Sequence, residues 1–189
     1  SAKKKTEPVL SELNGKKVAL MAVDGELTAK KVVEVALVNE LSKRGTFILM
    51  SKQDIDAVRL APEQNPTDWK GIAQKAGADY ALRAEILKFD ATNHEGYSSE
   101  KVYDSQLAEE QGTDGQTERL YKVKTLEGHV LVRLEFNRLS DPDIRVADAE
   151  ASDRVEADTR TSAIHLPPRL RFLEDLCYKA FRKFFDQYN

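Results

Sequence analysis

The residues able to do acid, base or nucleophilic chemistry are scattered along this chain of 189 residues, without the spacing of a catalytic or metal-binding motif. Its single cysteine, Cys177, has no second thiol with which to form a disulfide or a zinc site, and it falls on the apolar stripe of an expected helix. We interpret it as a core residue. The histidines His94, His129 and His165 lie far apart and show no ligand spacing, so we predict neither a metal nor a cofactor.

Two short segments could hold charged ligands, but each has a simpler explanation. The segment Asp141-Pro142-Asp143 matches a turn with proline at its second position, which we favour over a cation site. After the first apolar run the chain continues Asp24-Gly25-Glu26 with no further glycine until Gly45. Neither a phosphate loop nor a dinucleotide fingerprint can form there, and we predict that the chain is not an enzyme.

Composition limits the class of protein further. The chain carries 29 Lys and Arg against 32 Asp and Glu, a net charge of −3, so no nucleic acid partner is expected. No run of about 18 apolar residues occurs, which excludes an integral helical membrane protein. A compact fold of 21.3 kDa exposes roughly 9,000 Å². We predict a flexible leader over residues 1–15 and one globular domain over residues 16–189.

Alternating periodicities predict an α/β (α+β) fold in the order β-α-β-α-α-β-(insertion)-β-β-α, with a mixed twisted sheet of about five strands backed by helices. Before the insertion we expect three strands and three helices. The strands are placed at residues 18–23, 46–50 and 80–86; the helices begin at Thr28, Ser51 and the pair Asn65-Pro66.

Residues 90–118 interrupt this pattern with eight acidic residues and one lysine, a local charge of −7. We interpret them as a polar insertion without the alternation of membrane hairpins, either a solvated loop or a segment that becomes ordered on a basic partner. Its candidate partner-binding residues are Tyr97, Glu100, Tyr103 and Asp104. Removing residues 91–117 is expected to leave folding intact.

The last third predicts a strand hairpin and a closing helix. Apolar residues occupy every second position over residues 130–136. Gly128 before them marks a bulge, a bend or a turn, so this part of the chain forms either one bent strand or two strands. Pro167 and Pro168 introduce the last helix. Three aromatic residues of that helix lie off its main stripe and either contact a partner or belong to a wide core face: Tyr178, Phe185 and Tyr188.

Three segments, Lys17–Val23, Leu41–Lys52 and Ala76–Ile86, together resemble the CsgG-like periplasmic lipoproteins. That family includes the curli secretion channel subunit and LpoB-like activators of penicillin-binding proteins. The resemblance covers residues 17–89 well and residues 129–188 in outline. It implies an anticodon-binding-domain-like fold on an exported protein, tethered to the outer membrane by an N-terminal lipid whose cysteine is absent from this chain.

From this resemblance we expect a non-enzymatic periplasmic lipoprotein, attached to the outer membrane only through that lipid anchor. It would act as a protein-interaction module in secretion, envelope assembly or cell-wall synthesis, with an envelope protein as its partner. One alternative is a subunit of a ring-shaped, secretion-related homo-oligomer built through the aromatic last helix. Another, from a different class, is an RNA or nucleotide binding domain, suggested by the order of elements.

Overall fold

The computed structural model describes residues 7–112, 114–141, 143–160 and 165–189, and it confirms the predicted fold class. Five strands form one mixed sheet in the order β2-β1-β3-β4-β5, with β1 parallel to both of its neighbours. The strands are β1 (Lys17–Asp24), β2 (Ile48–Leu49), β3 (Tyr80–Tyr103), β4 (Gln116–Arg138) and β5 (Asp143–Asp158); the α-helices are α1 (Leu27–Arg44), α2 (Lys52–Arg59), α3 (Trp69–Lys75), α4 (Ser105–Gln111) and α5 (Arg169–Gln187).

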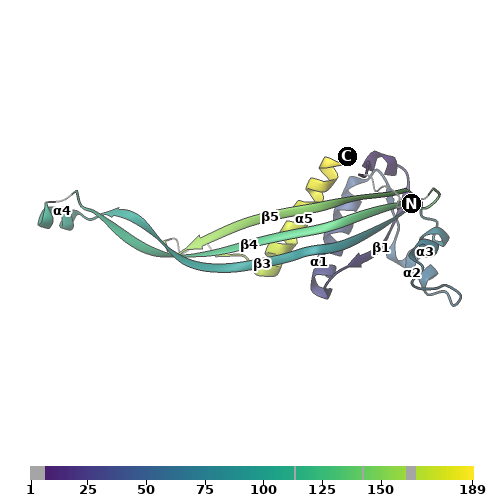
Figure 1. The fold of residues 1–189 in the computed structure, drawn as a ribbon, viewed down its shortest axis with the longest axis horizontal. Coiled ribbons are helices and arrows are strands. Elements are labelled where there is room, and N and C mark those ends of the chain that lie inside the picture. The colour runs from purple at the N-terminus through teal and green to yellow at the C-terminus, as the bar shows by residue number, and fades with distance from the viewer. Residues whose placement is uncertain (1–6, 113, 142, 161–164) are drawn as a thin grey trace, which may run out of the picture.

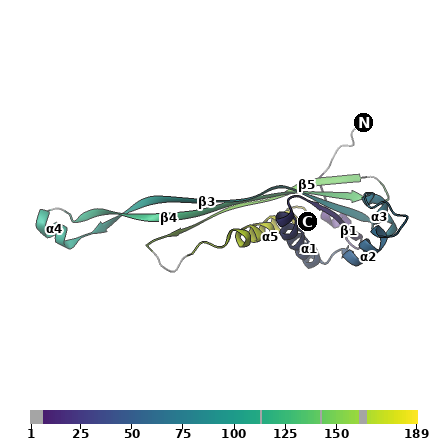
Figure 2. The same cartoon turned by 90° about the horizontal axis from the view of Figure 1, so that it is seen from below.

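Helices α1 and α5 lie together on one face of the sheet and enclose the main core (Figure 2). This arrangement follows from the alternation in β4, where Leu126, Val130, Val132, Leu134 and Phe136 are all buried toward the helices. Opposite them, β5 contributes the small residues Ala147, Ala149 and Ala151. The aromatic residues of α5 therefore fill the space above β5, and the Phe136 and Phe184 rings are stacked at 6.4 Å.

In the described part of the chain, the other face of the sheet is covered only at its β1 end. There α2 and α3 pack Ile55, Ile72 and Ala73 against Ala19 and Met21 in a second, smaller core. Over β4 and β5 this face is polar and carries cross-strand pairs such as Arg133 with Asp148, at 3.1 Å. A solvated face of this kind is usual for antiparallel strands.

Two helix starts differ from their predicted positions. The N-cap of α1 is Glu26 and not Thr28, because the Glu26 carboxylate accepts hydrogen bonds from the N–H groups of Thr28 and Ala29. These bonds lower the pKa of Glu26. Ser51 caps α2 as predicted, whereas α3 begins after Asp68, and Asn65 caps only the turn before it.

The predicted leader is too long at its C-terminal end. Leu10 and Leu13 belong to the short 3₁₀ helix η1 (Leu10–Leu13) and are buried in the main core. The N–H of Leu10 donates to the carbonyl of Tyr188 at 3.0 Å, so the segment is tied to the end of α5. The domain therefore begins before residue 16; residues 1–6 lie outside the described part of the chain.

The prediction of a polar loop over residues 90–118 is wrong in its secondary structure. Strands β3 and β4 pair as an antiparallel ladder from Tyr80 opposite Arg138 to Tyr103 opposite Gln116, with one bulge between Ile86 and Lys88 and none within this segment. They project far beyond the helices, with α4 at the tip (Figure 1). At a rise of about 3.3 Å per residue, the 24 residues of β3 extend for roughly 80 Å.

Gly128 lies within one continuous strand, which settles the open choice between one strand and two. A Cβ atom at this position would lie 2.5 Å from the Phe172 ring and 2.7 Å from Leu176 Cδ1. Glycine is therefore needed for the close approach of β4 to α5, and not for a turn.

The accessible surface of 11592 Å² exceeds the roughly 9,000 Å² of a compact protein of this mass, as a projecting ribbon requires. Among the described helices, none combines the length and apolar character needed to cross a membrane.

Candidate interaction surface

The projecting part of the hairpin begins where β5 ends. The last pair of β5 joins Asp158 to Val123, and one further bond runs from the Thr159 N–H to the Lys122 carbonyl at 3.1 Å. Beyond this point β3 and β4 are the only strands among the described residues, so residues 97–122 form a two-stranded ribbon that we call the arm (Figure 1). An isolated two-stranded ribbon is marginally stable in water, which makes contacts along the arm important for its order.

Arg160 holds the base of the arm to the end of β5. Its guanidinium lies 3.8 Å from the Tyr121 ring centroid and donates to Glu100 and to Asp158, both at 3.0 Å. The hydrogen bonds to Asp158 and then to Glu100 raise the pKa of Arg160 above its ordinary value. Glu100, predicted as a partner-binding residue, is thus engaged within the chain. The role of Arg160 could not be predicted from the sequence, because 60 residues separate it from Glu100.

The opposite face of the arm carries exposed apolar side chains. Tyr97 pairs with Lys122, Ser99 with Leu120 and Tyr103 with Gln116, so these side chains share one face of the ribbon. Tyr97 is 75% exposed, Leu120 71% and Tyr103 61%. Two of these three residues were predicted from sequence, whereas Leu120 was missed because its place opposite Ser99 depends on the strand register. We call Tyr97, Leu120 and Tyr103 the arm face.

Charge varies along the arm. At its base, Lys122 lies 3.1 Å from Glu95, and its hydrogen bond lowers the pKa of that carboxyl. The tip, residues 104–118, contains acidic residues and no basic ones. Asp104, another predicted contact residue, caps α4 by accepting from the N–H groups of Gln106 and Leu107. Its carboxylate therefore has a structural role at the tip.

The aromatic residues predicted to form a second contact surface on the last helix are used inside the molecule. Phe185 is 1% exposed and lies in the main core. Half-buried Tyr178 accepts a hydrogen bond from Asn39 on α1 at 2.7 Å, and Tyr188 packs on Phe184 at 4.8 Å. The wide-core alternative is therefore correct for Phe185, and these three residues form no continuous exposed face.

The candidate chemical residues remain separate in the fold. Cys177 is fully buried, and burial raises the pKa of its thiol to about 12, so it stays protonated at neutral pH. His94 lies on β3, His129 on β4 and His165 before α5. In the described ranges no three His, Cys, Asp or Glu residues gather as metal ligands would. Asp143 instead accepts from Arg145 at 2.8 Å; Pro142 of the predicted turn lies outside those ranges.

The chain thus belongs to the class of mixed α+β proteins with a projecting β-ribbon. No family model and no curated protein sequence matches it. Among solved structures, it is similar to the PelC dodecamer from Paraburkholderia phytofirmans, with 13% identity, a TM-score of 0.40, and coverage of 95% of this chain and 93% of that chain.

Two further structures show a comparable likeness. Lipoprotein GNA1162 from Neisseria meningitidis has 7% identity and a TM-score of 0.43, over 91% of this chain and 99% of that one. A DUF330 protein from Xanthomonas campestris has 9% identity and a TM-score of 0.42, over 97% of this chain and 88% of that one. Likenesses of this size carry no inference about function.

Proposed function

We propose that this chain is a non-enzymatic protein-interaction module that contacts a protein partner through the arm face. The observation that carries the proposal is the two-stranded ribbon, which projects from the body with Tyr97, Leu120 and Tyr103 exposed on one side. Aromatic and aliphatic side chains in this setting are typical anchors of protein interfaces. The acidic tip adds a charge preference, so we expect the partner to present a basic surface next to an apolar one.

The compartment is part of the same proposal. The resemblance of residues 17–89 to the CsgG-like lipoproteins supports a periplasmic module tethered to the outer membrane, serving secretion, envelope assembly or cell-wall synthesis. Protease protection of the full-length gene product in intact cells, compared with spheroplasts, tests this location. Digestion in lysed cells only, and not in spheroplasts, would contradict it.

Site-specific photo-crosslinking in cells tests the arm. A crosslinking amino acid at position 97 or 103 should give a discrete protein adduct, while the same group at exposed Glu85, on the body part of β3, should give none. Equal adducts from all three positions, or none from the arm, would reject the arm face as the contact site.

Self-assembly is the second candidate function, favoured by one observation. The outer edge of β5, 16 residues long, has no strand beside it within the described chain, and the sheet also ends in an open edge beyond β2. Open edges at both ends of a sheet allow head-to-tail association of copies. A crosslink from exposed position 150 on β5 to a second copy, together with a discrete oligomer in light scattering, would favour this function over a separate partner.

A further inference from the structure

The free edge of β1 forms the floor of a second potential binding site, distinct from the arm. Strand β2 pairs only with Lys17 and Val18 of β1, and the Met50 N–H donates to the Val18 carbonyl at 2.9 Å. The chain then turns away at Ser51 into α2, while β1 continues to Asp24. Residues 20–24 thus have no strand on their outer side among the described residues. Such an edge is a template for another strand.

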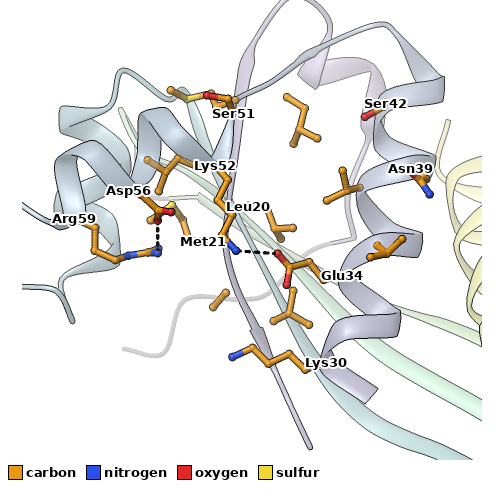
Figure 3. A pocket seen from close by; sticks show the side chains of 17 residues that line it. Leu20, Met21, Lys30, Glu34, Asn39, Ser42, Ser51, Lys52, Asp56 and Arg59 are labelled. Carbon is orange, nitrogen blue, oxygen red and sulfur yellow. Dashed lines mark hydrogen bonds and ion pairs between the residues drawn. The ribbon is translucent and has the colours of Figure 1, made fainter. Parts of the chain in front are cut away.

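A groove of about 650 Å³ runs along this edge between α1 and α2 (Figure 3). Its volume lies within the range of ligand sites. Both methionines of the chain, Met21 and Met50, line it, and flexible thioether side chains adapt to varied apolar partners. The other apolar lining residues are Leu20, Ala22, Val23, Val35, Val38, Leu49 and Ile55.

The two walls of the groove belong to opposite faces of the sheet. Helix α1 packs in the main core on one face, whereas Ile55 of α2 packs with Met21 in the smaller core on the other. Successive side chains of a strand point to opposite faces, except at the bulge where the register of β1 with β3 shifts between Leu20 and Ala22. A strand laid beside residues 20–24 would therefore direct alternate side chains toward α1 and toward α2, and both walls are apolar. This geometry suits an extended peptide.

The charges of the groove are unevenly matched. Lys52 from α2 meets Glu34 from α1 across the groove at 3.9 Å, and Arg59 pairs with Asp56 at 2.9 Å (Figure 3). Lys30 also lines the groove, and among the described residues it has no ion-pair partner. The exposed Lys52–Glu34 pair is weak and easily opened. The lining thus has three cations, two anions and a net charge of +1, which favours an acidic occupant.

We propose that this groove binds an extended segment of a partner protein, which adds as a strand beside residues 20–24. The segment carries apolar side chains at alternate positions and a carboxylate that pairs with Lys30. Main-chain hydrogen bonds to β1 supply affinity, and the two apolar walls supply selectivity. The proposal does not depend on the arm, because no residue of the groove belongs to residues 97–122.

Random dodecapeptides displayed on phage, selected on the full chain, test this proposal. The expected result is enrichment of peptides that alternate apolar residues and contain Asp or Glu. Binding of the best synthetic peptide should shift the amide NMR signals of residues 20–24. Lys30→Glu replaces the attraction with repulsion between like charges, so it should weaken that peptide by about three- to tenfold. Lys31→Glu, at the next exposed position of α1 outside the groove, should leave the affinity unchanged.

A second pair of variants tests the apolar wall. Val35, 58% exposed in the groove, tolerates Val35→Asp without loss of core packing, and this change should abolish peptide binding. Leu60→Asp, at an 80% exposed position outside the groove, is the control. Circular dichroism of each variant verifies folding. No enriched peptide class, or equal binding by Lys30→Glu, overturns the proposal. Self-association of the chain that Val35→Asp abolishes would assign the groove to a second copy instead.

Discussion

The guanidinium of Arg160 lies over the ring of Tyr121, 3.8 Å from its centroid, at the point where the β3-β4-β5 sheet narrows to the two-stranded arm. Arg160 also binds Glu100 on the neighbouring strand at 3.0 Å. Arg160, which follows the end of β5, thus contacts both strands of the hairpin. These contacts hold the base of the arm against the end of β5 and leave the arm face exposed.

Replacing Arg160 with alanine should loosen the arm and leave the body intact. We expect Arg160→Ala to raise amide hydrogen exchange of residues 97–122 by about two- to fivefold, because a cation–π contact and two exposed ion pairs are lost. The melting temperature should hardly change. Arg154→Ala removes comparable exposed pairs with Glu127 and Glu156 on the body and serves as the control. Equal exchange in both variants would contradict a role for Arg160 at the arm.

A methyl group at Gly128 should destabilise the fold. Gly128→Ala places a Cβ atom 2.5 Å from the Phe172 ring, so α5 must shift or tilt, at a cost of about 1–3 kcal/mol in the free energy of unfolding. Gly96→Ala is the matched control, because nothing lies within 4 Å of its Cβ position on the neighbouring strand. Urea unfolding measures both. If the two variants have the same midpoint, the close approach of β4 to α5 is not needed for stability.

Shortening of the hairpin should be tolerated only beyond the end of β5. Replacing residues 100–119 with Asn-Gly removes the ribbon and tip alone, so we expect the melting temperature of the body to remain. Deleting residues 91–117, which the sequence suggested would be harmless, also removes the β3 neighbours of buried Leu126. That deletion should lower the melting temperature. Equal melting of both truncated chains would show that the inner half of the hairpin adds nothing to the core.

Cys177 should make stability depend on pH only in alkaline solution. Burial raises its thiol pKa from 9.0 to about 12, so below pH 9 both states carry the proton and the group contributes no pH dependence. Between pH 9 and about 12 the unfolded chain ionises first. The free energy of unfolding should therefore fall by about 1.4 kcal/mol per pH unit more in this chain than in Cys177→Ala.

Thiol reactivity gives a second check on the same residue. A disulfide reagent at pH 8 should leave Cys177 unmodified in the native protein and label it fully in urea, because the side chain lies on the core-facing side of α5 and is fully buried. Rapid labelling of the native chain would contradict the buried position.

Local patterns predicted the elements whose contacts are close in sequence. The apolar run of β1, the Ser51 cap of α2 and the helical period of α5 all depend on residues only a few positions apart, and each is found in the structure. The predicted caps Thr28 and Asn65 were wrong because α1 and α3 begin at other residues, where Glu26 accepts from the N–H groups of Thr28 and Ala29, and Asp68 accepts from the N–H of Gly71. The sequence alone does not show which residue caps a helix, since several nearby polar side chains can do so.

By itself, the sequence determined the order of elements apart from η1 and α4, the α/β class and two residues of the arm face, Tyr97 and Tyr103, because alternation and composition are local properties. Only the tertiary structure decided that residues 90–118 form a ribbon: a polar two-stranded segment has no buried face and so no apolar alternation to detect. It alone also placed Leu120 on the same face of the arm as Tyr97, Arg160 over Tyr121, and the free edge of β1 between α1 and α2. These relationships join residues far apart in the chain, and their geometry depends on strand register and packing.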